Sequence, residues 1–245
     1  KKTKNYWLNL TNNMIRGIFF KFFFYLGFVL ICIIFLPALI MPSNIASFGG
    51  KLSGYWAKFC LRIFLSTKII IKGLENIDRS NKFFIACTHQ SQFETFFLQT
   101  IFKSPFFILK KELIGIPIFG SFLKKIGCIE ITRNKISKDN VDFYERVKLS
   151  IHKKNSPLII FPQGTRYDVK ERPDFKKGAS RIYNLNIKCL PVVLNSGSVW
   201  PKKGVMKSNK KLIISILKPF EIGLEGNVFL KKLQNKMYEE LDKIS

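Results

Sequence analysis

The chain has 245 residues, 47% of them hydrophobic, which is enough to bury a sizeable core and favours one domain plus an extension. Lysine and arginine outnumber aspartate and glutamate by 41 to 16, so the net charge of +25 indicates an anionic partner, and aromatic residues clustered in apolar runs argue against nucleic acid. Five cysteines without metal-ligand spacing argue against a metal centre and favour reduced thiols in a protein facing the cytosol.

The first predicted element is the uncharged segment 22–41, FFFYLGFVLICIIFLPALIM. These 20 apolar residues can cross a bilayer core of about 30 Å. Basic residues flank the segment on both sides, and positive charge normally marks the cytoplasmic side of a membrane. Because both flanks are basic and Pro37 and Pro42 can bend the chain, we favour a segment that dips into one leaflet and returns. A full span remains the alternative.

Residues 51–66, KLSGYWAKFCLRIFLS, are predicted to form an amphipathic helix at a membrane interface. We therefore expect a membrane-anchoring helical segment over residues 1–66 and a second domain over residues 67–245. We place the protein on the cytoplasmic membrane, with the second domain facing the cytoplasm. The helix carries Lys58 and Arg62 on one face, and its apolar residues recur at helical spacing on another: Leu52, Tyr55, Trp56, Phe59 and Ile63.

From residue 67 onwards, short apolar runs alternate with helical patterns. This alternation predicts an α/β domain whose mostly parallel central sheet is flanked by helices. Strands are predicted at 68–72, 83–88, 106–109, 128–132, 157–161, 189–194 and 212–217. Helices are predicted at 92–102, 117–126, 139–153, 177–185 and 228–243.

The loop after the predicted strand 83–88 carries His89, in the stretch THQSQFETF. Glu94 comes five residues later, and on a regular helix that offset turns about 500°, so the side chains would point roughly 140° apart. They can cooperate only if His89 lies on the loop and Glu94 in the first helical turn. Ser91 marks such a junction, because Ser-x-x-Glu is a capping signature. The two residues are therefore either a catalytic pair or simply the start of a helix.

Three further stretches place basic residues at the ends of predicted elements. In FPQGTR, 161–166, a proline ends the strand and a glycine permits a tight turn. KKELIGIPIFG, 110–120, begins with paired lysines, and DFKKGAS, 174–180, puts another pair near a helix start. Each stretch alone is also compatible with an ordinary solvated turn. A further predicted strand, 128–132, is followed by Arg133. The candidate anion-binding residues are Gly164, Thr165, Arg166, Lys111, Arg133 and Lys177.

In chain order, THQSQFET, KKELIGIPIFG with Arg133, FPQGTR and CLPVV resemble the four blocks of the 1-acyl-glycerol-3-phosphate acyltransferase family, the PlsC-type glycerolipid acyltransferases. The resemblance covers about residues 67–220. In that family the first block pairs its histidine with an aspartate, and the third usually reads EGTR. Here Glu94 and Gln163 stand at those positions. The HQSxxET form and NSGSVWPKKG, 195–204, look like some bacterial members.

The resemblance implies acyl transfer from acyl-CoA or acyl carrier protein to the free hydroxyl of lysophosphatidic acid at an anionic membrane surface, without cofactor or metal. His89 would be the general base, with a reference pKa near 6.5, and Glu94 would orient it. Arg166 with Gly164 and Thr165 would hold the phosphate, and Lys111, Arg133 or Lys177 would assist. Two alternatives stay open: another lysophospholipid or lipid amine as acceptor, or an inactive basic membrane-binding protein.

Overall fold

A seven-stranded sheet forms the centre of the structure, a computed structural model that describes residues 2–78, 82–131, 141–154 and 156–245. Its strand order is β1-β7-β6-β2-β5-β3-β4, and every neighbouring pair is parallel except β6 and β7. The predicted α/β fold is therefore confirmed, and each predicted strand is present: β1 (Lys68–Lys72), β2 (Phe83–Cys87), β3 (Phe106–Lys110), β4 (Ile129–Ile131), β5 (Leu158–Ile160), β6 (Lys188–Leu194) and β7 (Lys211–Ile216).

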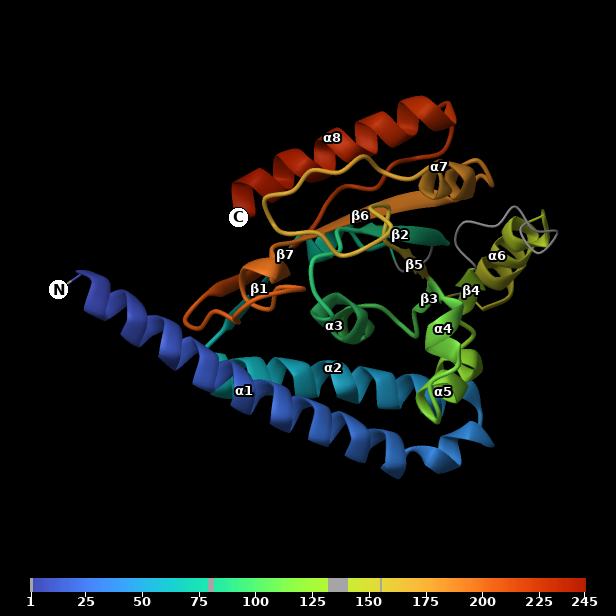
Figure 1. Ribbon diagram of the computed structural model, residues 1–245. Helices are drawn as coiled ribbons and strands as arrows, with labels where there is room; N and C mark the ends of the chain where they lie inside the picture. Colours follow the sequence, from blue (N-terminus) through green and yellow to red (C-terminus); the bar gives the residue numbers. More distant parts are fainter. Residues whose placement is uncertain (1, 79–81, 132–140, 155) are drawn as a thin grey trace.

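Helices cover both faces of the sheet (Figure 1). One face packs against α3 (Phe93–Ile101), α2 (Ser43–Leu65) and α1 (Lys2–Ile34). The other face packs against α6 (Val141–Lys154), α7 (Gly178–Tyr183) and α8 (Gly226–Ile244). Within the described residues, the remaining helical pieces are α4 (Lys111–Ile114), α5 (Phe119–Lys125), η1 (Leu36–Leu39), η2 (Leu74–Asn76) and η4 (Ser196–Ser198).

The five predicted helices correspond to α3, α5, α6, α7 and α8, whereas α4 was not predicted. Residues 132 and 139–140, which the predictions included, lie outside the described residues. The central strand β2 is buried at every position because helices cover both of its faces. This burial accounts for its uninterrupted apolar sequence.

The N-terminal segment forms a hairpin of two long helices. The chain reverses through η1, and Pro42 then precedes α2, which returns beside α1 (Figure 1). The predicted reversal of the chain near Pro37 and Pro42 is therefore confirmed, whereas the dip of this segment into one leaflet stays a prediction. The predicted helix 51–66 begins earlier in the structure, at Ser43. Gly49 and Gly50 weaken the helical pattern of the sequence before residue 51, but close tertiary contacts require glycine at both positions. A Cβ would lie 2.9 Å from the Phe35 ring at Gly49 and 2.0 Å from a side-chain oxygen at Gly50.

The hairpin shares a hydrophobic core with the sheet. Phe20 and Phe24 of α1 are fully buried and pack edge-on against Trp200, with ring centroids 4.9 and 5.1 Å away. Arg16 also donates hydrogen bonds of 2.6 Å to the Phe64 carbonyl and to the Ser66 hydroxyl. The boundary expected between residues 66 and 67 therefore coincides with the end of α2, but side chains from both segments fill one core.

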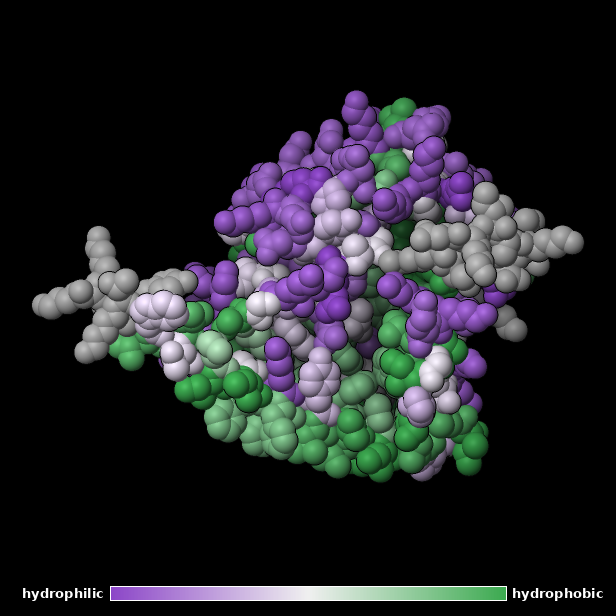
Figure 2. Space-filling view, in the orientation of Figure 1, coloured by the Kyte–Doolittle hydropathy of each residue, from purple (hydrophilic) through white to green (hydrophobic). Residues whose placement is uncertain are grey.

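The outer face of the hairpin is apolar. Figure 2 shows this surface as the green band along α1 and α2. Trp7–Ile34 is the one helical stretch among the described residues that is long and apolar enough to cross a membrane, on length and composition alone. This surface suits membrane association. Its most exposed large side chains include Trp7, Ile18, Phe22, Ile34, Ile40 and Phe48.

The contact between α2 and α3 leads to a stability prediction. A Cβ at Gly54 would lie 2.5 Å from the Phe96 carbonyl oxygen, so Gly54→Ala must push the helices apart. Overpacking of this kind costs about 1–3 kcal/mol, and we expect the melting temperature to fall by several degrees. Gly178→Ala is the control, because a Cβ there meets no heavy atom within 4 Å. Equal melting temperatures for the two variants would contradict the close packing.

Candidate active site

The chemistry-bearing stretches meet at one edge of the sheet. The strands β6, β2, β5 and β3 are consecutive neighbours and all run parallel, so their carboxyl ends share that edge. The loops that follow these strands begin at Asn195, Thr88 and Phe161, and β3 itself ends at Lys110. In open α/β sheets, ligands bind outside the carboxyl ends of the strands. Four stretches that lie far apart in sequence thus surround one site.

His89 lies on the loop between β2 and α3, as predicted, and the loop after β5 fixes its backbone. Its N–H donates to Gln163 Oε1 at 2.6 Å, and its carbonyl accepts from the Tyr167 N–H at 3.0 Å. The imidazole stacks on the Phe161 ring, with centroids 4.0 Å apart and planes at 18°. A glutamate at position 163 would accept the same bond from His89, so the glutamine keeps this structural role.

Glu94 lies in the first turn of α3 and is fully buried. Its Oε1 accepts from the N–H groups of Gln90 at 2.9 Å and Ser91 at 3.0 Å, and from Ser196 Oγ at 2.5 Å. The Ser91 hydroxyl accepts in turn from the Phe93 N–H at 3.1 Å. Ser91 and Glu94 thus make the hydrogen bonds predicted for the helix start, although the residue at the N-cap position is Gln92 rather than Ser91. The orientation of His89 by Glu94 stays a prediction.

The environment of Glu94 disfavours its charge. Burial raises the pKa of the Glu94 carboxyl to about 7, although the bonds from Ser196, Gln90 and Ser91 oppose the rise. The pKa thus falls close to neutral pH, where catalytic acids and bases are often poised. This shift marks the site, but a buried structural carboxyl would show it as well.

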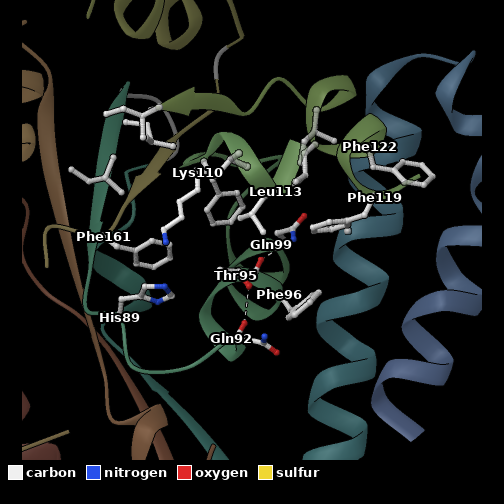
Figure 3. Close-up of a pocket in the computed structure, with 18 of the residues that line it drawn as sticks. His89, Gln92, Thr95, Phe96, Gln99, Lys110, Leu113, Phe119, Phe122 and Phe161 are labelled. Carbon is white, nitrogen blue, oxygen red and sulfur yellow. Dashed lines mark hydrogen bonds between the residues drawn. The ribbon is translucent and has the colours of Figure 1, made fainter. Parts of the chain in front are cut away.

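A cavity of about 890 Å³ opens beside His89. Figure 3 shows the His89 and Phe161 rings at one side and Phe119 and Phe122 of α5 at the other, next to the N-terminal helices. Gln92, Thr95 and Gln99 form a polar row along α3 between these ends (Figure 3). Most of the wall is apolar, with side chains from α1, α3, α4 and α5. This shape suits a long hydrocarbon chain with a polar group near His89.

Basic side chains gather at the His89 end of the cavity. Arg166, Lys110, Lys176 and Lys202 line it, and Lys110 extends toward the Phe161 and His89 rings (Figure 3). The Arg166 carbonyl accepts a bond of 3.2 Å from Lys202 Nζ, which joins two of the surrounding loops. Such a cluster of cations suits a phosphate.

The structure separates the candidate anion-binding residues. Gly164, Thr165 and Arg166 line the cavity, and Gly164 takes the positive φ of 79° that favours glycine. The predicted residues Lys111 and Lys177 are not among the described residues that line the cavity. Their neighbours Lys110 and Lys176 line it instead. Arg133 lies outside the described residues.

Two further residues of the site were not singled out from sequence. Ser196 holds Glu94, and Lys202 lines the cavity. Both belong to the stretch NSGSVWPKKG, 195–204, which was noticed only as a whole. The sequence signal that could have identified these two residues is the position of this stretch directly after the predicted strand 189–194. Over the described ranges, no cluster of three or more His, Cys, Asp or Glu side chains has the geometry to hold a metal ion.

Comparisons with known proteins agree with this architecture. The family model described as Acyltransferase matches residues 68–195. A 1-acyl-sn-glycerol-3-phosphate acyltransferase of Pseudomonas aeruginosa is 33% identical over 158 residues, 62% of this chain and 60% of the relative. The protein of that name from Helicobacter pylori is 29% identical over 185 residues, 74% of this chain and 77% of the relative.

The chain spans only part of several curated relatives: 60% of the P. aeruginosa protein and 52% of a chloroplastic one from Arabidopsis thaliana. Among solved structures, the crystal structure of the 1-acyl-sn-glycerophosphate (LPA) acyltransferase, PlsC, from Thermotoga maritima matches with a TM-score of 0.74. The match covers 95% of this chain and 98% of that chain at 18% identity, so it shows a shared fold.

Proposed function

This chain belongs to the Acyltransferase family, and we propose that it transfers a fatty acyl group from acyl-CoA or acyl carrier protein to the free hydroxyl of 1-acylglycerol-3-phosphate. The product is phosphatidic acid. The observation that carries the proposal is the cavity of about 890 Å³, which joins a basic end beside His89 to a long apolar interior. The names of the relatives support this acceptor.

In the proposed reaction, His89 is the general base. Its imidazole takes the proton of the acceptor hydroxyl while that oxygen attacks the thioester carbonyl. The tetrahedral intermediate then collapses, the carbon–sulfur bond breaks, and the imidazolium returns the proton to the leaving thiolate. Glu94 orients the imidazole and stabilises its charged form. General-base help of this kind accelerates a reaction about 10²–10⁴-fold.

The two ends of the cavity divide the recognition of the acceptor. Arg166 and Lys110 hold the phosphate, because a guanidinium fork and an ammonium group both suit phosphate oxygens. Lys176 and Lys202 add positive charge at the same end. The apolar wall takes a fatty acyl chain. In the proposed binding mode, the acceptor hydroxyl lies between the phosphate and the fatty acyl chain, beside His89.

We further propose that the α1–α2 hairpin holds the protein on an anionic membrane surface, on its cytoplasmic face. The hairpin presents a broad apolar surface, and α2 exposes Lys58 and Arg62 beside it. An amphipathic surface with basic residues binds anionic lipid through both burial and charge. Cell fractionation with sided protease mapping tests this placement.

A turnover assay of the full chain in mixed micelles tests the function. We expect phosphatidic acid to form from lysophosphatidic acid with acyl-CoA or with acyl carrier protein. Lysophosphatidylcholine and a lipid amine serve as competing acceptors, because they lack the phosphate monoester that the cationic end would bind. Faster acylation of either competitor would replace the proposed acceptor. No turnover on any acceptor with either donor would favour an inactive membrane-binding protein.

The neighbouring lysines of β3 and α4 provide a matched test of phosphate binding. We expect Lys110→Ala to raise the KM for lysophosphatidic acid about tenfold or more, because it removes a charge-assisted contact at the cavity. Lys111→Ala should leave the KM nearly unchanged, since that side chain does not line the cavity. Steady-state kinetics over a range of acceptor concentrations make the comparison. A larger effect for Lys111→Ala would reverse the assignment.

A further inference from the structure

The corner formed by α4 and α5 exposes apolar side chains in addition to those of the N-terminal hairpin. Leu113, Ile116 and Ile118 are 39%, 44% and 42% exposed. Lys111 precedes the corner and Lys124 and Lys125 follow it, whereas Lys110 lines the cavity. An apolar tip between basic residues matches an anionic lipid leaflet, in which acyl chains lie beneath negative headgroups.

The backbone at the tip of this corner is strained. Ile118 has φ 62° and ψ −58°, and the Phe119 N–H donates to the Pro117 carbonyl at 2.6 Å across it. This is a γ-turn with positive φ, a rare conformation that is unfavourable for a β-branched residue. Glycine would adopt it more easily. The turn thus exposes the large apolar side chain of Ile118 at a position where the backbone conformation favours glycine.

The corner is continuous with the hairpin. The Phe119 ring packs edge-on against Phe28 of α1, with centroids 5.6 Å apart. α5 also packs against α2 and η1. Figure 2 shows green side chains over the corner next to the green band of the hairpin. The cavity lies between the two, since Leu113 and Ile116 line it together with Phe28.

We propose that residues 113–118 are a second membrane-contact element, which inserts Leu113, Ile116 and Ile118 into an anionic leaflet beside the hairpin. The part of the cavity wall that Leu113 and Ile116 form then lies next to lipid, and a lipid chain can enter there without crossing water. The flanking lysines and the continuity with the hairpin surface identify lipid as the occupant of the corner. This inference concerns how the protein meets the membrane and holds for any lipid acceptor.

Fluorophore depth in vesicles tests the contact directly. Ile116→Cys is introduced in a full-length background with Cys32→Ser and Cys128→Ser, which removes the two half-buried thiols. That cysteine is labelled with an environment-sensitive fluorophore. The labelled protein is then mixed with phosphatidylglycerol-containing vesicles whose acyl region carries a quencher. We expect a blue shift and strong quenching.

Two labelled positions calibrate the result. Ile40→Cys reports the hairpin turn, where the side chain is 91% exposed. Ile222→Cys is the negative control, because this side chain is 51% exposed but lies far from the corner. Its neighbour Phe220 pairs with Cys189 at the amino end of β6, whereas the cavity lies at the carboxyl ends of the strands. Quenching at positions 40 and 116 but not 222 supports the proposal. Quenching at 40 alone overturns it while leaving the hairpin anchor, and quenching at neither overturns both.

Ile118→Gly separates membrane contact from folding. Glycine relieves the strained turn, so the melting temperature should stay the same or rise. Removal of the exposed apolar side chain should weaken sedimentation with the same vesicles roughly tenfold. Ile222→Gly, also in a loop, should bind as the unmodified protein does. Unchanged vesicle binding by Ile118→Gly would overturn the proposal.

Discussion

Glu94→Gln should fold normally and lose most of its turnover, about 10²–10⁴-fold. A glutamine oxygen can still accept the bonds from the Gln90 and Ser91 N–H groups and from the Ser196 hydroxyl, so the start of α3 should persist. The neutral amide, however, stabilises an imidazolium poorly and can favour the wrong tautomer of His89. Steady-state turnover with lysophosphatidic acid measures the loss. Near-normal turnover in a well-folded variant would assign Glu94 to capping alone.

The same variant should gain stability at alkaline pH. The pKa of the Glu94 carboxyl is raised from 4.5 to about 7 by burial, so the folded protein favours the protonated form. The associated stability is fully present below pH 4.5 and is lost as the pH rises through 7. Glu94→Gln avoids that loss. Its melting temperature should equal or exceed that of the unmodified protein at pH 8, and the difference should shrink toward pH 5.

A double-variant cycle tests whether the two residues act as one unit. His89→Ala should lose about as much turnover as Glu94→Gln, and the double variant little more, because members of one catalytic unit are not additive. Glu239→Gln, an exposed glutamate on α8, is the control for the charge change and should keep full turnover. Multiplied losses in the double variant would show that Glu94 acts independently of His89.

Much of the fold was predictable because local patterns agree with it. Buried strands in a parallel sheet are apolar on both faces, and the runs at β2 and β6 have that composition. The antiparallel pairing of β6 with β7 was not predictable, since an apolar run carries no information about strand direction. The early start of α2 was not predicted, because Gly49 and Gly50 weaken the helical pattern of the sequence. The reason for these glycines is tertiary, since the side chains of Phe35 and Gln99 pack directly against them.

The site was predictable only where its determinants are local in sequence. The positions of His89 and Glu94 followed from an offset and a capping signature. Ser196 holds Glu94 from 102 residues away, and nothing local signals that contact. The placement of Lys110 rather than Lys111 on the cavity depends on where β3 ends and α4 begins. A shift of one residue at a strand end changes the side-chain direction, and sequence patterns do not fix boundaries that finely.

Arg166→Ala should impair the use of lysophosphatidic acid more than the use of the acyl donor. The change removes a charge-assisted contact of about 1.5–3 kcal/mol, which corresponds to a rise of about 10–150-fold in the KM for the acceptor. The arginine follows the positive-φ turn at Gly164, and its carbonyl accepts from Lys202, so its backbone is held on both sides. Kinetics with the acceptor and the donor varied separately measure the two effects.

Arg166→Lys should recover little of the loss, because an ammonium group lacks the planar fork that binds two phosphate oxygens together. Arg146→Ala, which removes an exposed arginine on α6, is the control for the lost charge and should leave both KM values unchanged. A rise confined to the KM for acyl-CoA, and absent with acyl carrier protein, would place a donor phosphate on Arg166. Unchanged acceptor dependence would mean that the acceptor phosphate binds elsewhere, and Lys110 would then be the first residue to test.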